Sequence, residues 1–368
     1  MHEFNNALDA LLNHCHKQPD QIAYQVLDKK GSVIADIDYL TLWNRSHSIS
    51  QIIASHSAPG DRVAIIYDTE LDFICALLGC FMANTIAIPC AQPQQLPKKA
   101  HVSLIRLKTL VENATPTLIL TTAKTQTLLQ DPATLDLLGS KQQALSNITI
   151  IDSNTIATET HLLQPKEIKP IAYLQYTSGT TGNPKGVIIT HANVSNNVNN
   201  ILNELDSNNP DMFKTAVNWL PLHHDMGLIN AILLPLYAGQ LSVLISPINF
   251  LRNPYVWLQA IASHPSVMSG GPNFGYDFCC KKISEQQKAD LDLSGWNVAY
   301  VGADTSREQQ LMEFLITFGE CNIKPTVFHP CYGLAEATVY VSGDKTFQGL
   351  QVSSFARDGL AQLQVTPS

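Results

Sequence analysis

The sequence predicts an α/β fold in which mainly parallel sheets are flanked by helices and arranged in two lobes. Three observations support this prediction. The chain has 368 residues, of which 45% are hydrophobic and 15% charged, and a chain of this length buries roughly 75% of its unfolded surface. Short apolar runs alternate with helical patterns along the sequence. The apolar runs are continuous, which is typical of strands that are covered on both faces.

The predicted strands are short apolar runs bounded by turn residues. They cover residues 62–67, 85–89, 117–121, 148–152, 171–176, 215–219, 241–246, 266–269, 297–301 and 326–328. Helical patterns fill the gaps; the segment 101–114, for example, places Leu104, Leu107 and Val111 on one stripe. The predicted helices are 41–56, 71–83, 101–114, 192–205, 226–238, 254–263 and 306–318.

Two polar segments interrupt this alternation. Residues 91–100 read as a loop because of their prolines and polarity, and residues 205–213 are predicted to divide the lobes. The approximate lobes are therefore 1–205 and 206–345. Residues 346–368 lose the alternation, and we interpret them as the start of a further, unfinished segment.

Charge and cysteine content narrow the class of protein. A net charge of −8 argues against a nucleic-acid binder, which usually presents a basic face. The N-terminus has no basic region followed by an apolar run, so no signal peptide is expected. The longest apolar stretch, 73–83, is too short to span a membrane. Eight cysteines without a Cys-x-x-Cys pair favour reduced thiols in a cytoplasmic protein.

Residues 176–186, YTSGTTGNPKG, form the densest candidate for ligand binding. Glycines permit backbone geometries that direct several N–H groups at one anion, serine and threonine add hydroxyl donors, and Lys185 adds a positive charge. The run predicts a site for a triphosphate or pyrophosphate, with a plain surface turn as the alternative. The order of residues in this run matches neither the P-loop of NTPases nor the Gly-x-Gly-x-x-Gly fingerprint of dinucleotide-binding proteins.

This run resembles the phosphate-loop signature of the adenylate-forming superfamily, which includes acyl-CoA synthetases, peptide-synthetase adenylation domains and luciferases. The resemblance implies that the loop holds the β- and γ-phosphates of ATP. The residues that match the signature are Thr177, Ser178, Gly179, Thr180, Thr181, Gly182 and Lys185.

A second run, NWLPLHHDMGLI at residues 218–229, resembles the segment typical of fatty acyl-AMP ligases. The resemblance implies that His224 orders a carboxylate substrate and that Asp225 orients His224 or caps a helix. His223 stands where an aromatic residue is more usual. A zinc site at His223, His224 and Asp225 is the alternative, but zinc needs about four ligands and adjacent side chains diverge.

A third run, FHPCYGLAEAT at residues 328–338, is also similar to acyl-AMP ligases. It implies that Tyr332, followed by Gly333, stacks on adenine, and that Glu336 holds Mg²⁺ against the phosphates. The alternative is that Tyr332 belongs to the core and Glu336 is an exposed helix residue. With His224 and Lys185, Glu336 completes the expected catalytic residues.

Two weaker matches follow predicted strands. Gly302, Ala303 and Asp304 stand where the superfamily wraps adenine with Gly-Ala-Glu. Residues 269–274 resemble the segment that lines the acyl tunnel, with a strand-ending turn as the alternative. The residues assigned to this tunnel are Gly270, Gly271, Asn273 and Phe274.

The resemblance spans residues 39–343 and identifies the chain as similar to the large N-terminal domain of fatty acyl-AMP ligases, without their small C-terminal domain. It implies activation of a fatty acid by ATP and Mg²⁺, followed by transfer to the phosphopantetheine thiol of an acyl carrier protein. A long-chain acyl-CoA ligase and a catalytically silent nucleotide- or acyl-binding module stay open as alternatives. Without the C-terminal domain, the chain alone is expected to adenylate fatty acids poorly.

Overall fold

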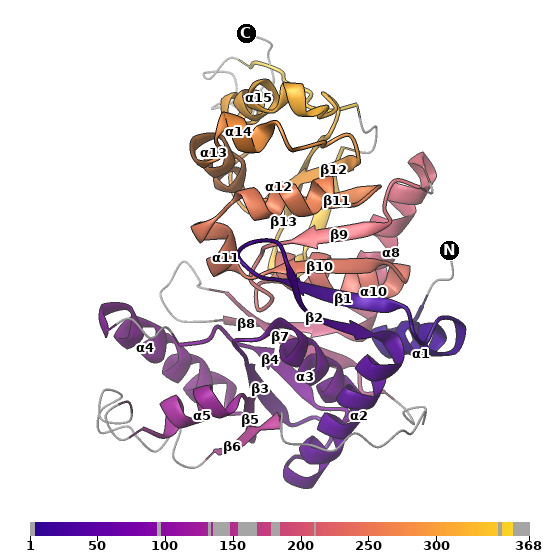
Figure 1. Ribbon diagram of the computed structural model, residues 1–368. Coiled ribbons are helices and arrows are strands. Elements are labelled where there is room, and N and C mark those ends of the chain that lie inside the picture. Colours follow the sequence, from indigo (N-terminus) through magenta and orange to yellow (C-terminus); the bar gives the residue numbers. More distant parts are fainter. Residues whose placement is uncertain are drawn as a thin grey trace.

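Two β-sheets, each covered by helices, form the frame of the protein (Figure 1). The computed structural model describes residues 4–93, 97–131, 134, 148–153, 168–177, 185–209, 211–344 and 348–355. Within these residues the sheets have six and eight strands. Neighbouring strands pair in parallel except at β1–β2, β7–β8 and β13–β14, each of which adds an edge strand. The predicted α/β class with mainly parallel sheets is confirmed.

The six-stranded sheet is built from residues 62–190. Its order is β6 (Thr149–Asp152), β5 (Leu118–Thr121), β3 (Arg62–Ile66), β4 (Ile86–Pro89), β7 (Ile171–Thr177) and β8 (Lys185–Thr190). Alternate residues of β3 face opposite sides. Val63 and Ile65 join the main core with α2 (Tyr39–His56) and α3 (Glu70–Met82), while Ala64 and Ile66 pack with α4 (Pro97–Ala114) and α5 (Ala123–Gln130).

The eight-stranded sheet carries the candidate site. Its order is β14 (Tyr340–Gly343), β13 (Phe328–Gly333), β12 (Trp296–Val301), β11 (Val267–Gly271), β9 (Thr215–Asn218), β10 (Leu241–Ile245), β1 (Ile22–Leu27) and β2 (Val33–Asp38). Each predicted strand overlaps an observed one, although 326–328 meets β13 only at Phe328. Four observed strands, β1, β2, β8 and β14, were not predicted. β2, β8 and β14 are half-exposed edge strands, and the apolar run of β1 is interrupted by Gln25.

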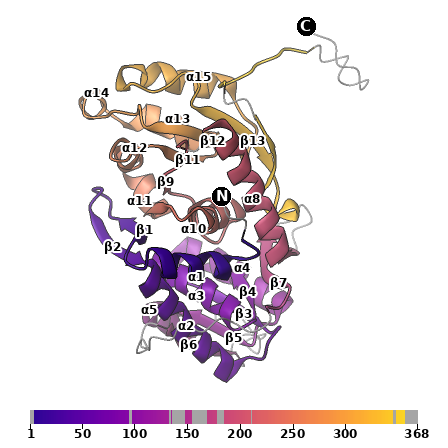
Figure 2. The same ribbon diagram turned by 90° about the vertical axis from the view of Figure 1, so that its right-hand side faces the viewer.

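Helices cover both faces of this sheet (Figure 2). One face holds an aromatic cluster in which Trp257, Tyr276 and Phe314 surround Trp296. The helices that build this face are α11 (Pro247–Arg252), α12 (Tyr255–Ala262), α13 (Asn273–Lys282) and α15 (Glu308–Thr317), with α14 (Glu285–Lys288) and η4 (Gly319–Cys321) nearby. The other face is covered by α8 (His191–Asn208) and by the segment that follows β9.

The strands do not divide at residue 205, where the sequence analysis separated the lobes. β1 and β2 belong to the sheet formed by the second half of the chain, and α1 (Ala7–Lys17) contacts α10 (Leu234–Ala238) of that half as well as α2 and α3. β1 pairs in parallel with β10, and the Tyr24 hydroxyl donates to the carbonyl of Ile232 at 2.9 Å. A boundary drawn from composition alone cannot register such long-range pairing.

The helix predicted at 226–238 is in fact three successive segments. They are α9 (Asp225–Gly227), the π-helix η3 (Leu228–Leu233) and α10 (Leu234–Ala238). Side chains from three strands bind consecutive carbonyls of η3: Asn218 binds Asn230 at 3.1 Å, Ser242 binds Ala231 at 2.7 Å and Tyr24 binds Ile232. These donors hold the wider turn in place, and π-helical turns are frequent at functional sites.

The remaining expectations concern membranes and thiols. No helix in the described part of the chain has both the length and the hydropathy needed to cross a bilayer. The eight cysteines are free, and most of them are buried. Burial raises the pKa of the Cys75, Cys80 and Cys90 thiols to about 12, so they are neutral and unreactive at ordinary pH.

Candidate active site

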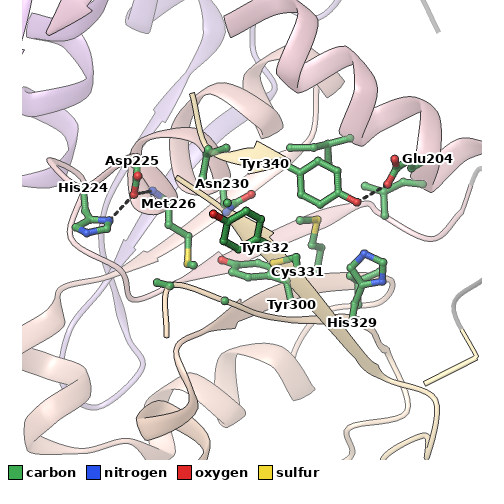
Figure 3. Close-up of a pocket in the computed structure, with 18 residues that line it drawn as sticks. Glu204, His224, Asp225, Met226, Asn230, Tyr300, His329, Cys331, Tyr332 and Tyr340 are labelled. Carbon is green, nitrogen blue, oxygen red and sulfur yellow. Dashed lines mark hydrogen bonds and ion pairs between the residues drawn. The ribbon is translucent and has the colours of Figure 1, made fainter. Parts of the chain in front are cut away.

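A cavity of about 220 Å³ lies between α8 and the face of the eight-stranded sheet (Figure 3). Most of its wall is apolar: Ile201, Leu205, Met226, Met268, Val298 and Val339. Polar side chains interrupt this wall at a few points, as is usual for small-molecule sites. They include His224, Asp225, Asn230, Tyr332, Tyr340 and Glu204.

His224 and Asp225 lie at one end of this cavity. The His224 side chain is 58% exposed, and its Nδ1 lies 2.6 Å from Asp225 Oδ1. Asp225 Oδ1 also accepts from the backbone N–H of Met226 at 2.6 Å. A Cβ on Gly227 would lie 2.1 Å from the carbonyl oxygen of Pro221, so the turn that presents His224 requires glycine. Asp225 therefore fixes the ring of His224, one of the two roles expected for it.

His223 lies in a different environment from its neighbour. Burial lowers the pKa of His223 to about 4, so this imidazole is neutral at ordinary pH. Its carbonyl oxygen accepts from Nε2 of Gln175 at 3.0 Å. Gln175 belongs to β7, which ends at Thr177 within the phosphate-loop motif. The hydrogen bond thus ties the strand that leads into this loop to the turn that carries His224.

The ion pair between His224 and Asp225 predicts a measurable titration. The hydrogen bond that the His224 ring donates to the Asp225 carboxylate raises the pKa of His224. Protonated His224 therefore stabilises the fold below the unfolded-state pKa of about 6.5, and this contribution is lost as pH rises through the folded-state value. We expect Asp225→Asn to lower the pKa of His224, as followed by NMR titration of the ring proton.

The matched control for this titration is Asp211→Asn. Asp211 is an exposed carboxylate that contacts Lys214 rather than a histidine. Asp211→Asn should leave the pKa of His224 at its wild-type value. An unchanged His224 pKa in Asp225→Asn would show that the carboxylate does not govern the protonation of this ring.

Tyr332 and Gly333 come from the end of β13 and line the same cavity. Tyr332 is 62% exposed, so its ring is available at the surface rather than in the core. A Cβ on Gly333 would lie 1.7 Å from the carbonyl oxygen of Val339, which restricts this position to glycine. The alternative of a core tyrosine is wrong for Tyr332.

Glu336 lies in the short 3₁₀ helix η5 (Ala335–Ala337), with an exposed side chain. It borders a second cavity of about 230 Å³, together with Ile188 and Ile189 of β8. Within the described residues, no three His, Cys, Asp or Glu side chains approach closely enough to hold a metal ion. A single carboxylate can nevertheless serve Mg²⁺, which commonly binds one carboxylate together with substrate phosphates.

The phosphate loop is seen only at its two ends. Thr177, the last residue of β7, pairs with Lys185, the first residue of β8, so the two strands form an antiparallel hairpin. β8, which was not predicted, stands between the loop and α8, the helix predicted at 192–205. The predicted ligands Ser178, Gly179, Thr180, Thr181 and Gly182 lie outside the described residues.

The two weaker matches divide between the cavity and the core. Gly302 and Ala303 line the cavity, and Ala303 has a positive φ of 65°. Asp304 is exposed, and its Oδ1 accepts from the N–H of Thr305 at 2.7 Å. Asn273, from the predicted tunnel segment, is buried and donates to the carbonyl of Thr305 at 2.6 Å, so it supports this loop.

The other residues of the predicted tunnel segment pack away from the cavity. Cβ atoms on Gly270 and Gly271 would meet Tyr300 and Trp219, respectively, at less than 3 Å. The ring of Phe274 lies 5.4 Å from that of Trp219, and the side chain is 48% exposed. None of these residues is among those that border the cavity of about 220 Å³.

Several residues that build the site were missed by the sequence analysis. Asn197 of α8 donates to the carbonyls of Ala337 and Tyr340 and accepts from the N–H of Tyr340. It therefore braces the chain just after Glu336, where Thr338 has a positive φ of 74°. The residues of α8 that recur at helical spacing, including Ile201 and Leu205, supply one wall of the cavity. The helical spacing of these residues was visible in the sequence, but the sequence did not show that they face the cavity.

Comparison with known proteins agrees with this geometry. The family model described as AMP-binding enzyme matches residues 11–356. The medium-chain-fatty-acid–[acyl-carrier-protein] ligase JamA of Moorena producens is 32% identical over 369 residues, which cover 99% of this chain and 60% of that protein. The long-chain-fatty-acid–AMP ligase FadD26 of Mycobacterium marinum is 34% identical over 340 residues, which cover 90% of this chain and 56% of that protein.

Solved structures give the same result. The fatty acid AMP ligase from Legionella pneumophila superposes with a TM-score of 0.87 at 33% identity, covering 100% of this chain and 61% of that one. A fatty acyl-adenylate ligase from L. pneumophila, solved with acyl adenylate and pyrophosphate, gives a TM-score of 0.83 at 33% identity, with 96% and 60% coverage. The chain thus spans about 60% of the length of these relatives. It belongs to the family of AMP-binding enzymes, as the phosphate-loop resemblance predicted.

Proposed function

We propose that the protein to which this chain belongs activates a fatty acid with ATP to an acyl-adenylate and transfers the acyl group to an acyl carrier protein. The observation that carries the proposal is the apolar cavity with His224 at one end and Tyr332 on its wall. Such a cavity suits an alkyl chain, an imidazole suits its carboxylate, and an exposed aromatic ring suits adenine. The names of the relatives, a fatty acid–carrier-protein ligase and a fatty acid–AMP ligase, support the same substrates.

The reaction requires mainly that the two reactants are aligned and that the negative charge of the phosphates is neutralised. A carboxylate oxygen of the fatty acid attacks the α-phosphorus of ATP and forms the new O–P bond. The bond from that phosphorus to the bridging oxygen breaks, and pyrophosphate leaves. In this proposal His224 orders the carboxylate, Lys185 and the phosphate loop hold the β- and γ-phosphates, and Glu336 would hold Mg²⁺, which neutralises phosphate charge when bound.

The acyl acceptor separates this proposal from a long-chain acyl-CoA ligase. The spelling of the motifs around His224 and Tyr332, and the carrier protein in the name of the JamA ligase, favour a carrier thiol. Supplying either coenzyme A or a carrier protein distinguishes the two by the thioester formed. The buried, neutral thiols support a reducing, cytoplasmic setting.

The proposed acyl site predicts that affinity rises with chain length. Each buried CH₂ contributes about 0.8 kcal/mol, or roughly fourfold in affinity. We therefore expect saturated fatty acids of increasing length to bind this chain more tightly until the cavity is full, as measured by isothermal titration. Affinity that ignores chain length, or a preference for amino acids, would point to another substrate class. Titration with AMP alone reports separately on the nucleotide site.

A further inference from the structure

One side chain of the cavity is polar, buried and not engaged with the protein. Asn230 is only 9% exposed and lines the cavity of about 220 Å³. Its backbone carbonyl accepts from Asn218, but its side-chain amide makes no hydrogen bond to any described residue. A polar side chain that opens into a largely apolar cavity without a protein partner is available to bind a ligand there.

Three other polar side chains of the cavity do have partners within the protein. His224 contacts Asp225, the Tyr340 hydroxyl donates to Glu204 at 2.7 Å, and the Tyr300 hydroxyl donates to Asn218 at 2.7 Å. In Figure 3, Asn230 lies between the end of the cavity with His224 and the end with Glu204. Its amide therefore faces the middle of the space that the acyl chain is proposed to fill.

The backbone that carries Asn230 is held by neighbouring strands, which fixes the point from which its side chain enters the cavity. Asn230 belongs to the π-helix η3, whose carbonyls at residues 230–232 are bound by side chains of three different strands. Asn218 also accepts from Tyr300, which itself lines the cavity. A polar group carried on a rigid element discriminates between ligands that pair with it and ligands that do not.

The surroundings of Asn230 restrict the group that could pair with it. The amide of Asn230 can donate a hydrogen bond and accept one. A hydroxyl group is a neutral partner that can do both in return. A second carboxylate would meet the acidic side chain of Glu204, and any charged group would lose its hydration in a largely apolar space. A plain alkyl chain would leave the amide unpaired.

We propose that Asn230 selects acyl chains that carry a hydroxyl group part-way along the chain. This inference rests on the proposed function, because it assumes that the acyl chain occupies this cavity. It deepens that function by naming the substrate class: a hydroxylated fatty acid rather than an unsubstituted one.

The test compares dodecanoate with a set of monohydroxydodecanoates that differ in the position of the hydroxyl, each titrated calorimetrically into this chain. We expect at least one interior isomer to bind about tenfold more tightly than dodecanoate, and 12-hydroxydodecanoate to gain less. If dodecanoate binds and no interior isomer binds more tightly, the inference is overturned while the proposed function stands. If none of the acids binds, the proposed function itself fails.

Two variants assign the selectivity to Asn230. Asn230→Leu keeps the branched shape and removes the hydrogen-bonding groups, so it should abolish the preference for the hydroxylated isomer. Met268→Leu alters another cavity side chain without changing its polarity, and the preference should survive. Equal weakening of every acid by Asn230→Leu would place the amide at the carboxylate and overturn the inference. Melting curves accompany each variant, and the comparison of isomers on the wild type needs no variant.

Discussion

Gly270→Ala should strongly destabilise the protein. Gly270 lies in β11 and pairs with Tyr300 of β12. A Cβ at this position would sit 2.0 Å from the carbonyl oxygen of Tyr300 and 2.7 Å from its ring. The neighbour is backbone in the middle of a sheet, so the strands themselves must move. Overpacking of a core costs about 1–3 kcal/mol and occasionally more, and we expect this case to exceed that range.

The measurement is a thermal melt, in which we expect the midpoint to fall by about 5 °C or more. Gly319→Ala is the matched control, because a Cβ there would meet nothing within 4 Å and the backbone has no positive φ. It should leave the midpoint nearly unchanged. A Gly270→Ala midpoint equal to that of Gly319→Ala would mean that β11 and β12 separate more easily than their register suggests.

This case illustrates how the resemblance and the structure assign different roles to the same glycine. The sequence analysis assigned Gly270 and Gly271 to an acyl tunnel by resemblance. The structure supports a packing role, because the absence of side chains lets β11 approach β12 and Trp219. A sequence motif records that a small residue is needed but not which neighbour requires it.

The fold was predictable where strands are buried on both faces. Residues 62–66 and 241–245 are continuous apolar runs, and their strand character follows from composition. Residues 33–38 and 185–190 are edge strands with exposed positions, and their pairing depends on partners far away in the sequence. The π-helix at 228–233 depends on donors from three strands, so no local pattern could indicate it.

The candidate site was predictable only as separate motifs. His224, Tyr332 and Gly302 were named from the sequence, and the structure brings them to one cavity. Other residues of the cavity, such as Asn230 and Tyr300, stand outside the recognised motifs. The sequence indicates only the helix or strand that carries each of them. Which of its side chains face the cavity becomes clear only once that element has a position in the fold.

Lys185→Ala and Glu336→Gln should each weaken the binding of Mg·ATP by about tenfold or more. Both side chains are exposed and free to meet a ligand, and hydrogen bonds to charged groups are among the stronger ones in proteins. η5, which carries Glu336, packs against β8, which Lys185 begins, so the two variants address one region. Glu336→Gln should in addition raise the Mg²⁺ concentration needed for ATP to bind, whereas Lys185→Ala should not.

Isothermal titration with ATP at several Mg²⁺ concentrations measures both effects, and a melting curve shows whether each variant is folded. Lys169→Ala replaces an exposed lysine just before β7, and Glu320→Gln replaces a glutamate in the 3₁₀ helix η4, so they match the two substitutions in kind. Neither control should change the affinity for Mg·ATP. If the wild type binds Mg·ATP and both site variants bind it equally well, the triphosphate lies elsewhere, and the roles of Lys185 and Glu336 must be withdrawn. A loss confined to Lys185→Ala would keep the phosphate loop and remove Glu336 as the magnesium ligand, because a carboxylate that holds the ion must alter the dependence on its concentration.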